Sequence, residues 1–532
     1  MIKRMYFLFL ITIISIPGMT QTRFPVVLVN TGTGSYINEP AVCINPKNTS
    51  QIAGGSVLNN FYYSSNRGVT WNGGVLSTTY GGVWGDPALT VDTNNNFYYI
   101  HLNSGSGSGW WLDRIVCQKS TDGGQTWSNG TYFGMNSPKQ QDKCWPVVNR
   151  ANNHIYATWT QFDSYGTSNP SDSSIILFTK SVDQGATWSS PLRLSRRAGD
   201  CVDGSNTDEG AVPCVGPNGQ IYVSWAGPVG LMFNRSLDDG NTWVNANIFV
   251  DSMPGGWNIS IPGIDRSNGM PVCCCDLSNG PYRGTVYINW ADIRNGSNDA
   301  DIWFRKSTDQ GNTWSARKRV NDDPPGKEQF LTWMTVDNVT GYIYIVFNDR
   351  RNYSDNETDI YLAVSTDGGQ NFVNIKLDQN PFTPSSSIFF GDYTNISAYN
   401  NIVRPVWEDE NGSSDTKTIY MALIDSIYTN PITWSGGTST DWNNPWNWTP
   451  WSVPTGNQDV VIPQVAAARY YPNVNIAGLS CNNLTINANA SVTVPASMTF
   501  EVKGNLTILN GGTLTNNGTI TLRGNLINQN TP

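Results

Sequence analysis

The feature that most constrains the fold is a nine-residue phrase that recurs along the chain. It reads "KSTDGGQTW" in the copy that ends at Trp127, and related copies end at Trp188, Trp243, Trp314 and Phe372. A weaker copy, "SSNRGVTW", ends at Trp71 and carries Asn66 where the others carry Asp. Self-similarity at a regular spacing is the signature of a repeat architecture, so these copies decide the fold class first.

Each recurring residue of the phrase S-x-D-x-G-x-T-W has a local structural role. The Ser and Asp side chains can accept hydrogen bonds from backbone N–H groups of their own turn. Gly supplies a backbone conformation closed to other residues, and Trp fills the gap against a neighbouring strand. Six copies therefore indicate a turn that stabilises the fold, rather than six active sites.

Each phrase belongs to a longer unit, with a pitch of about 50 to 65 residues. A unit reads as an apolar strand, a Gly/Asn turn, an aromatic-rich strand, a variable loop, a third strand, the Asp-containing turn and a fourth strand. Seven such units begin near Asn38, Asp86, Asp142, Glu209, Met270, Gln329 and Gly391. Four-stranded antiparallel sheets repeated radially form a propeller, so the sequence predicts an all-β, seven-bladed β-propeller over residues 21–429.

The phrase resembles the Asp-box (BNR) repeats of sialidase-like propellers, especially those of secreted bacterial proteins. Stretches such as "GTVYINWADIRNGSNDADIW" and "QFLTWMTVDNVTGYIYIVFNDRR" are similar as well, and the resemblance covers residues 38–426. It implies a glycoside hydrolase of the exo-α-sialidase kind that acts on extracellular glycans. Because one fold hosts several tasks, a non-catalytic glycan- or protein-binding propeller and a structural surface protein remain alternatives.

The two ends of the chain differ from the propeller. Lys3 and Arg4 followed by "MYFLFLITIISI" predict a signal peptide over residues 1–20, and hence secretion or display at the cell surface. Short repeated β phrases, such as "KGNL" at Lys503 and "RGNL" at Arg523, predict a small β-rich module, a solenoid or a sandwich, over residues 430–532. The last phrase breaks off at "NQNTP", which leaves room for a further sorting domain.

Charge and rare residues exclude several functions. A net charge of -9 argues against nucleic acid and anionic membranes as partners, and no run after the leader approaches the roughly 18 apolar residues of a membrane span. We expect a monomer that binds a glycan. With only two His residues, neither a Ser-His-Asp triad nor a multi-histidine zinc site is expected. Cys201 and Cys214 flank one loop and could form a disulfide.

Carboxylates recur where the first strand of a blade begins. If these strands run along the propeller axis, their starts converge on the face opposite the Asp boxes, which brings together Glu39, Asp86, Asp142, Glu209 and Asp392. Like charges at close range shift pKa values or recruit a cation. The structural alternative is that each carboxylate caps a backbone N–H group at the start of its blade.

The loops after the second strands contribute to the same face. They contain Arg294, Arg350 and Arg351, which could clamp a carboxylate or sulfate bidentately, or form salt bridges within their own loops. Asp and Asn side chains there could hold Ca²⁺ through oxygen, although the spacing is not that of an EF-hand and no cofactor is required.

The resemblance to sialidases also implies site roles. Those enzymes use a Tyr nucleophile paired with Glu, an Asp acid/base and three Arg that hold the sugar carboxylate. On this resemblance Tyr393 is the nucleophile, Glu209 or Glu39 its partner and Asp86 the acid, with Asp392 beside Tyr393. The sequence departs from the family where the first inner strand begins, because "NEP" places Glu39 where the family has Arg. The superficially similar "TRFPVVLV" is predicted to close the ring as the last outer strand.

Overall fold

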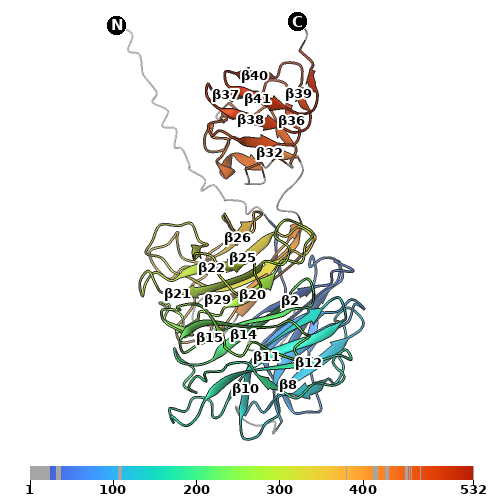
Figure 1. Cartoon of the computed structure of the whole chain (residues 1–532), viewed down its shortest axis with the longest axis vertical. Coiled ribbons are helices and arrows are strands. Elements are labelled where there is room, and N and C mark those ends of the chain that lie inside the picture. Colours follow the sequence, from blue (N-terminus) through green and yellow to red (C-terminus); the bar gives the residue numbers. More distant parts are fainter. Residues whose placement is uncertain are drawn as a thin grey trace, which may run out of the picture.

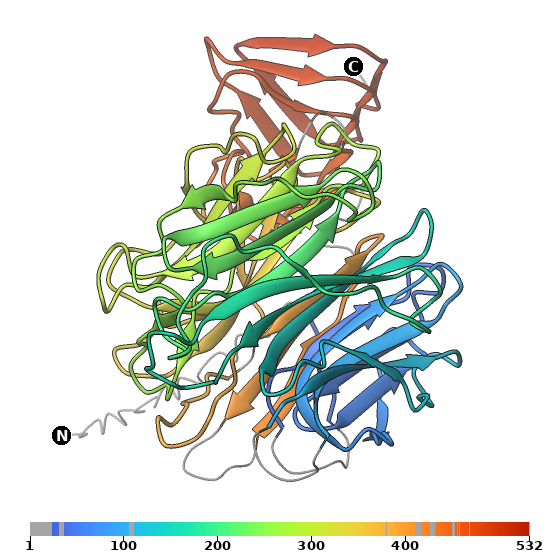
Figure 2. The same ribbon diagram turned by 60° about the horizontal axis from the view of Figure 1, so that its bottom comes forward.

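The structure is a computed structural model, and it is all-β apart from one short 3-10 helix among the residues it describes (Figures 1 and 2). The described residues are 24–30, 37–105, 111–378, 380–410, 417–425, 431–449, 453–454, 456, 458–467 and 469–530. The predicted signal peptide, residues 1–20, lies outside these ranges. Within them, no helix is long and apolar enough to cross a membrane.

The first four blades follow one another as antiparallel sheets of four strands in sequential order. Blade 1 contains β2 (Ala41–Ile44), β3 (Ile52–Ser56), β4 (Asn60–Ser64) and β5 (Asn72–Val75). Blade 2 contains β6 (Gly82–Val91), β7 (Phe97–Ser104), β8 (Arg114–Ser120) and β9 (Thr131–Phe133). Blade 3 contains β10 (Gln140–Asn149), β11 (His154–Phe162), β12 (Ser174–Ser181) and β13 (Leu192–Arg193). Blade 4 contains β14 (Glu209–Val215), β15 (Ile221–Gly227), β16 (Gly230–Ser236) and β17 (Ile248–Asp251).

A short hairpin separates blade 4 from the remaining three, and it pairs β18 (Asn258–Ile259) with β19 (Ser267–Asn268). Blade 5 contains β20 (Val272–Cys275), β21 (Val286–Asp292), β22 (Asp301–Ser307) and β23 (Lys318–Arg319). Blade 6 contains β24 (Gln329–Val336), β25 (Ile343–Asp349), β26 (Asp359–Ser365) and β27 (Val373–Lys376). Blade 7 contains β28 (Asn395–Tyr399), β29 (Ile402–Glu410), β30 (Lys417–Ala422) and, paired with β29, β31 (Ile424–Asp425).

The ring is closed by the N-terminal strand. β1 (Val26–Leu28) pairs antiparallel with β30, so the first and last parts of the propeller share one sheet. This confirms both the seven-bladed propeller and the predicted role of "TRFPVVLV". The second strands β7, β15, β21 and β25 are buried along their whole length, because neighbouring blades cover both faces of each sheet. Their near-continuous apolar character has the same cause.

The recurring turns adopt the predicted hydrogen-bonded conformation. In the second copy, Asp122 accepts hydrogen bonds from the Thr126 N–H group (3.0 Å), the Thr126 hydroxyl (2.6 Å) and the Ser120 hydroxyl (2.7 Å). In the weaker first copy, Asn66 accepts a bond from the Thr70 N–H group at 3.0 Å, while its own amide donates to the Thr70 hydroxyl at 2.9 Å. An amide therefore fits the same turn.

The aromatic residue that ends each turn packs against the preceding blade. The rings of Trp243 and Phe178 lie 4.9 Å apart, and the next blades repeat this contact as Trp314 with Phe233 at 5.2 Å. Edge-on aromatic pairs of this kind stabilise beyond the apolar area they bury. The Asp boxes thus join successive blades, as expected of a structural turn.

The C-terminal module is a β-solenoid built from parallel strands, which decides between the two predicted alternatives (Figure 1). One sheet contains β33 (Trp448–Thr449), β32 (Ile432–Trp434), β34 (Val460–Ile462), β36 (Leu484–Ile486), β39 (Leu506–Ile508) and β42 (Leu526–Asn528). The others contain β35 (Leu479–Cys481), β38 (Thr499–Val502) and β41 (Thr519–Leu522), and β37 (Ser491–Val494) with β40 (Thr513–Asn516). The 3-10 helix η1 (Pro445–Asn447) precedes β33. Trp434, Trp442 and Trp448 are buried in the core of the solenoid.

The bridge that Cys201 and Cys214 could have formed is absent from the structure. Both thiols are free, and the Cys214 sulfur instead lies 3.0 Å from that of Cys273 on the first strand of the next blade. The topology explains this, because neighbouring first strands run side by side along the propeller axis. Sequence proximity across a loop was therefore a poor guide to spatial proximity.

We predict that Asp122→Ala lowers the free energy of unfolding by about 1–3 kcal/mol, since several hydrogen bonds to one carboxylate are lost together. The matched variant Asp122→Asn should lose much less, because Asn66 shows that an amide preserves the turn. Urea unfolding of both variants checks this. Equal losses in the two variants would contradict the hydrogen-bond account.

Candidate functional site

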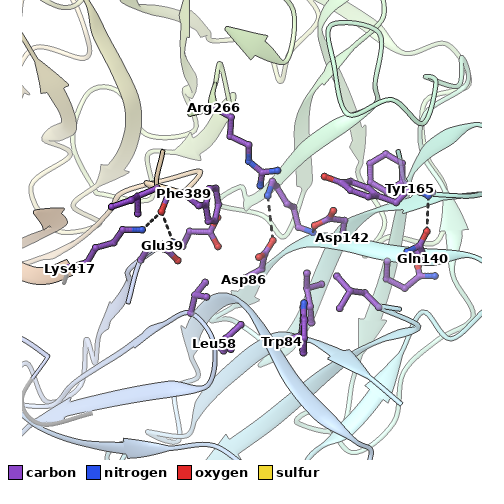
Figure 3. A pocket seen from close by; sticks show the side chains of 18 of the residues that line it. Glu39, Leu58, Trp84, Asp86, Gln140, Asp142, Tyr165, Arg266, Phe389 and Lys417 are labelled. Atoms are coloured by element: carbon purple, nitrogen blue, oxygen red, sulfur yellow. Dashed lines mark hydrogen bonds and ion pairs between the residues drawn. The ribbon is translucent and has the colours of Figure 1, made fainter. Parts of the chain in front are cut away.

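A cavity of about 980 Å³ opens on the face opposite the Asp boxes (Figure 3). Its wall comes from blades 1, 2, 3 and 7 together with Arg266 of the β18–β19 hairpin. The cavity thus lies off the propeller axis. Blades 1 to 3 supply the ends of their second strands and the starts of their first strands, as predicted for this face.

Irregular backbone aims three charged side chains at the cavity. The first strands of blades 2 and 3 contain β-bulges, around Asp86 in β6 and Lys143 in β10. The φ angles are +49° for Asp86, +30° for Lys143 and +52° for Glu39, just before β2. Non-glycine residues rarely adopt positive φ, and those that do cluster at functional sites. Bulges beside sites commonly redirect a side chain in this way.

A buried ion network forms the floor of the cavity. The Lys143 ammonium lies 2.5 Å from Asp392 and 3.6 Å from Asp86. The Arg266 guanidinium donates to Asp392 through two nitrogens, one of them at 3.0 Å. The Asp392 backbone N–H group donates to Glu39 at 3.0 Å. Asp392 is therefore contacted by three residues far apart in the sequence, Lys143 and Arg266 through its carboxylate and Glu39 through its backbone.

The charges of this network set its protonation states. Burial alone would raise the pKa of Asp392, but Arg266 and Lys143 outweigh it and hold that pKa well below its ordinary value. Burial would lower the pKa of Lys143, yet Asp392 and Asp86 keep it well above its usual range. Glu39 differs, because burial and then Asp86 raise its pKa well above the ordinary value. Burial and the neighbouring carboxylate thus favour the neutral form of Glu39, in contrast to Asp392.

Asp142 lies in the wall next to this floor and titrates near neutrality. Burial raises its pKa to about 7, and the negative charge of Asp86 contributes, against the opposing effect of Lys143. Glu209 is buried behind the wall, and burial followed by Asp203 raises its pKa well above the ordinary value. Asp203 in turn accepts a hydrogen bond from Tyr165 at 2.5 Å and pairs with Arg266 at 3.4 Å. Asp203 therefore contacts both Tyr165 and Arg266, and its charge adds to the rise in the pKa of Glu209.

The structure brings together most of the predicted carboxylates. Glu39, Asp86 and Asp142 line the cavity, and Asp392 lies directly beneath as the anchor of both cations. Tyr393 lies under the floor, where its hydroxyl donates to the Pro87 carbonyl at 3.3 Å and its ring packs 4.8 Å from that of Trp145. Burial raises its pKa well above the ordinary value, which disfavours the phenolate that a nucleophile needs.

The three predicted arginines are placed elsewhere. Arg294 pairs with Asp292 and Asp251, and Arg351 pairs with Asp349 and Asp322. Arg350 instead donates to the Pro262 carbonyl in the β18–β19 connection. They belong to blades 5 and 6, whose loops do not contribute to the described cavity wall. Local salt bridges, the alternative weighed from sequence, describe Arg294 and Arg351, and we leave all three arginines out of the site.

Several site residues were not predicted from the sequence. Lys143 follows Asp142 and occupies the bulge position that Asp86 occupies in the previous blade, so alignment of the repeats could have found it. Arg266 lies in the longest connection between an Asp box and the first strand of the following blade. The unusual length of this connection could have indicated an insertion that contributes to the site. Trp84, Tyr165 and Phe389 also line the cavity and had no distinctive spacing.

The described residues contain no group of three or more His, Cys, Asp or Glu side chains arranged to hold a metal ion. The acidic residues at the cavity are neutralised by Lys143 and Arg266 instead. Calcium binding by the loop oxygens stays a prediction.

Comparison with known proteins supports the character of the fold. The chain is 24% identical over 276 residues to a protein named Sialidase from Bacteroides fragilis (strain YCH46), which covers 48% of this chain and 47% of that protein. The chain thus spans about half the length of this curated relative. Residues 433–531, within the solenoid, match a family described as "Domain of unknown function (DUF8693)". With its Asp-box turns, the N-terminal ring is a sialidase-like β-propeller.

Solved structures resemble the chain only distantly. A protein of unknown function from Dyadobacter fermentans DSM 18053 is 14% identical, with a TM-score of 0.42 over 64% of this chain and 94% of that one. The NanB sialidase from Streptococcus pneumoniae is 10% identical, with a TM-score of 0.42 over 70% of this chain and 83% of that one. The assignment of a seven-bladed propeller therefore rests on the strand pairing within this chain.

We predict that Asp392→Asn lowers the free energy of unfolding by about 3 kcal/mol or more, because it leaves Lys143 and Arg266 without their shared buried carboxylate. The matched variant Asp322→Asn, which removes the exposed partner of Arg351, should lose less than about 1 kcal/mol. Chemical unfolding at several pH values measures both.

The pH dependence of the same variant has a definite sign. The folded-state pKa of Asp392 is depressed, so its stabilisation is present above its unfolded pKa of about 3.9 and is lost as the pH falls further. The difference between Asp392→Asn and the parent should therefore shrink below about pH 4. A difference independent of pH would show that the stabilisation does not come from the ionised carboxylate.

Proposed function

We propose that the protein is a glycoside hydrolase that acts on extracellular glycans through the carboxyl groups of this cavity. The supporting observation is Asp142, a cavity-lining carboxyl group with a pKa of about 7. Beside it lies a second carboxyl group, Asp86, which is ion-paired with Lys143. Glycoside hydrolysis by two carboxyl groups needs one that retains a proton and one that is ionised, and environment separates the two.

In this proposal each residue has a defined role. Asp142 donates its proton to the leaving oxygen, and Asp86 stabilises the positive charge that develops on the sugar or activates the attacking water. Lys143, Asp392 and Arg266 position Asp86 and keep the floor electrostatically balanced. The predicted signal peptide, the acidic charge and the match to a protein named Sialidase support an extracellular glycan as the partner.

One observation favours a second function, glycan binding without hydrolysis. Lys143 and Arg266 are both engaged with Asp392, so the floor is internally neutralised as in a structural network. In this alternative the exposed ring of Tyr165 and the ring of Trp84 form the sugar-binding surface. The same mutations would then alter affinity, with no turnover to lose.

The deciding assay is hydrolysis of a panel of fluorogenic glycosides, sialosides included, by the protein with and without Ca²⁺. We expect Asp142→Asn to lose at least about a hundredfold in kcat/KM, the usual contribution of a general acid. The control Asp172→Asn, on the loop before β12, should keep full activity and melting temperature. Absence of turnover on every substrate, together with glycan binding, would assign the protein to the binding class.

The pH profile tests the acid directly. Because Asp142 must be protonated to act, kcat/KM should fall as the pH rises through about 7. Measurement from pH 5 to 9 on one substrate suffices. A rate that keeps rising above pH 7 would exclude Asp142 as the acid.

A further inference from the structure

One side of the cavity wall is almost entirely apolar. It consists of Val57 and Leu58 from blade 1, Trp84, Leu102 and Leu112 from blade 2, and Phe162 from blade 3. In Figure 3, Leu58 and Trp84 lie on the side of Asp86 away from Arg266. The cavity therefore has a charged side, from Glu39 to Asp142, and an aliphatic side that adjoins it.

The aliphatic side does not suit a glycan alone. A sugar ring carries hydroxyl groups around its edges, and their burial against Leu and Val side chains without hydrogen-bond partners is unfavourable. Flat aromatic rings can cover a sugar face, but Val57, Leu58, Leu102 and Leu112 present branched aliphatic groups. A volume of about 980 Å³ also lies at the upper end of the roughly 300–1,000 Å³ usual for ligand sites.

We propose that the cavity binds a glycoside whose aglycone is an aliphatic chain, with the chain along Leu58, Trp84 and Leu112. The placement of the sugar at Asp86 and Asp142 rests on the proposed function. Hydrolysis then breaks the bond between the anomeric carbon and the chain's oxygen, which takes the proton of Asp142. Water supplies hydroxide to the anomeric carbon and returns a proton to the enzyme, so the products are a free sugar and an alcohol.

The test measures binding of methyl and n-octyl β-glycosides of glucose, galactose and N-acetylglucosamine to the full chain by calorimetry. Each buried methylene should tighten binding by up to about fourfold, so the octyl glycoside of at least one sugar should bind a hundredfold or more tighter than its methyl counterpart. Trp84→Ala and, separately, Leu112→Ala should each lose about tenfold or more of the octyl affinity. The control Trp446→Ala, on the solenoid, should change nothing.

Other outcomes separate the inference from the proposed function. Equal affinities for methyl and octyl glycosides, or equal losses in Trp84→Ala and Trp446→Ala, would overturn the aliphatic site even if the protein hydrolyses glycosides. A chain-length preference in a parent protein that hydrolyses none of the glycosides would support the aliphatic site and refute the hydrolase. The same preference in Asp142→Asn would show that binding of the chain does not depend on the proposed acid.

A further arm distinguishes the source of the chain. Binding to phosphatidylcholine vesicles that contain galactosylceramide, weakened in Trp84→Ala, indicates a membrane glycolipid. Binding of soluble octyl glycosides alone indicates a free amphiphile.

Discussion

The carboxylate of Asp392 holds together the parts of the chain that build the site. It lies between blade 6 and blade 7, yet it binds Lys143 of blade 3 and Arg266 of the hairpin after blade 4, and its backbone donates to Glu39 of blade 1. A buried carboxylate is stabilised only if cations and donors replace its water, and here two cations do so. Without Lys143 and Arg266, the buried carboxylate of Asp392 would carry its full desolvation penalty. The positions of the three side chains therefore depend on one another.

This anchor also explains how charge is distributed over the cavity. Lys143 and Arg266 are drawn toward Asp392, which leaves Glu39, Asp142 and Glu209 with burial as the dominant influence and raises their pKa values. A carboxylate of low pKa thus lies beside carboxyl groups whose pKa values burial raises. Among these, Asp142 lies in the cavity wall with a pKa of about 7, where a proton donor is useful at neutral pH.

The sequence predicted the propeller well because its evidence was repeated. The six copies of the Asp box predict the same turn, and the aromatic strands between them recur at the same offset. Blade number, strand order and ring closure by "TRFPVVLV" could therefore be predicted. The convergence of Glu39, Asp86, Asp142 and Asp392 followed from the same symmetry. What repetition predicts is the position of a residue within its blade, and that was sufficient for strand starts.

Repetition could not predict which blades would share a site. The loops of Arg294, Arg350 and Arg351 lie at equivalent places in blades 5 and 6, but the cavity is off the axis and is walled by blades 1, 2, 3 and 7. That asymmetry arises from non-repeated segments: the β18–β19 hairpin that delivers Arg266, and the segment before β28 that places Phe389 and Asp392. A regular fold therefore supplies the scaffold, while its irregular insertions select the blades that form the site. The same division explains why a propeller can be recognised from its turns when its ligand cannot.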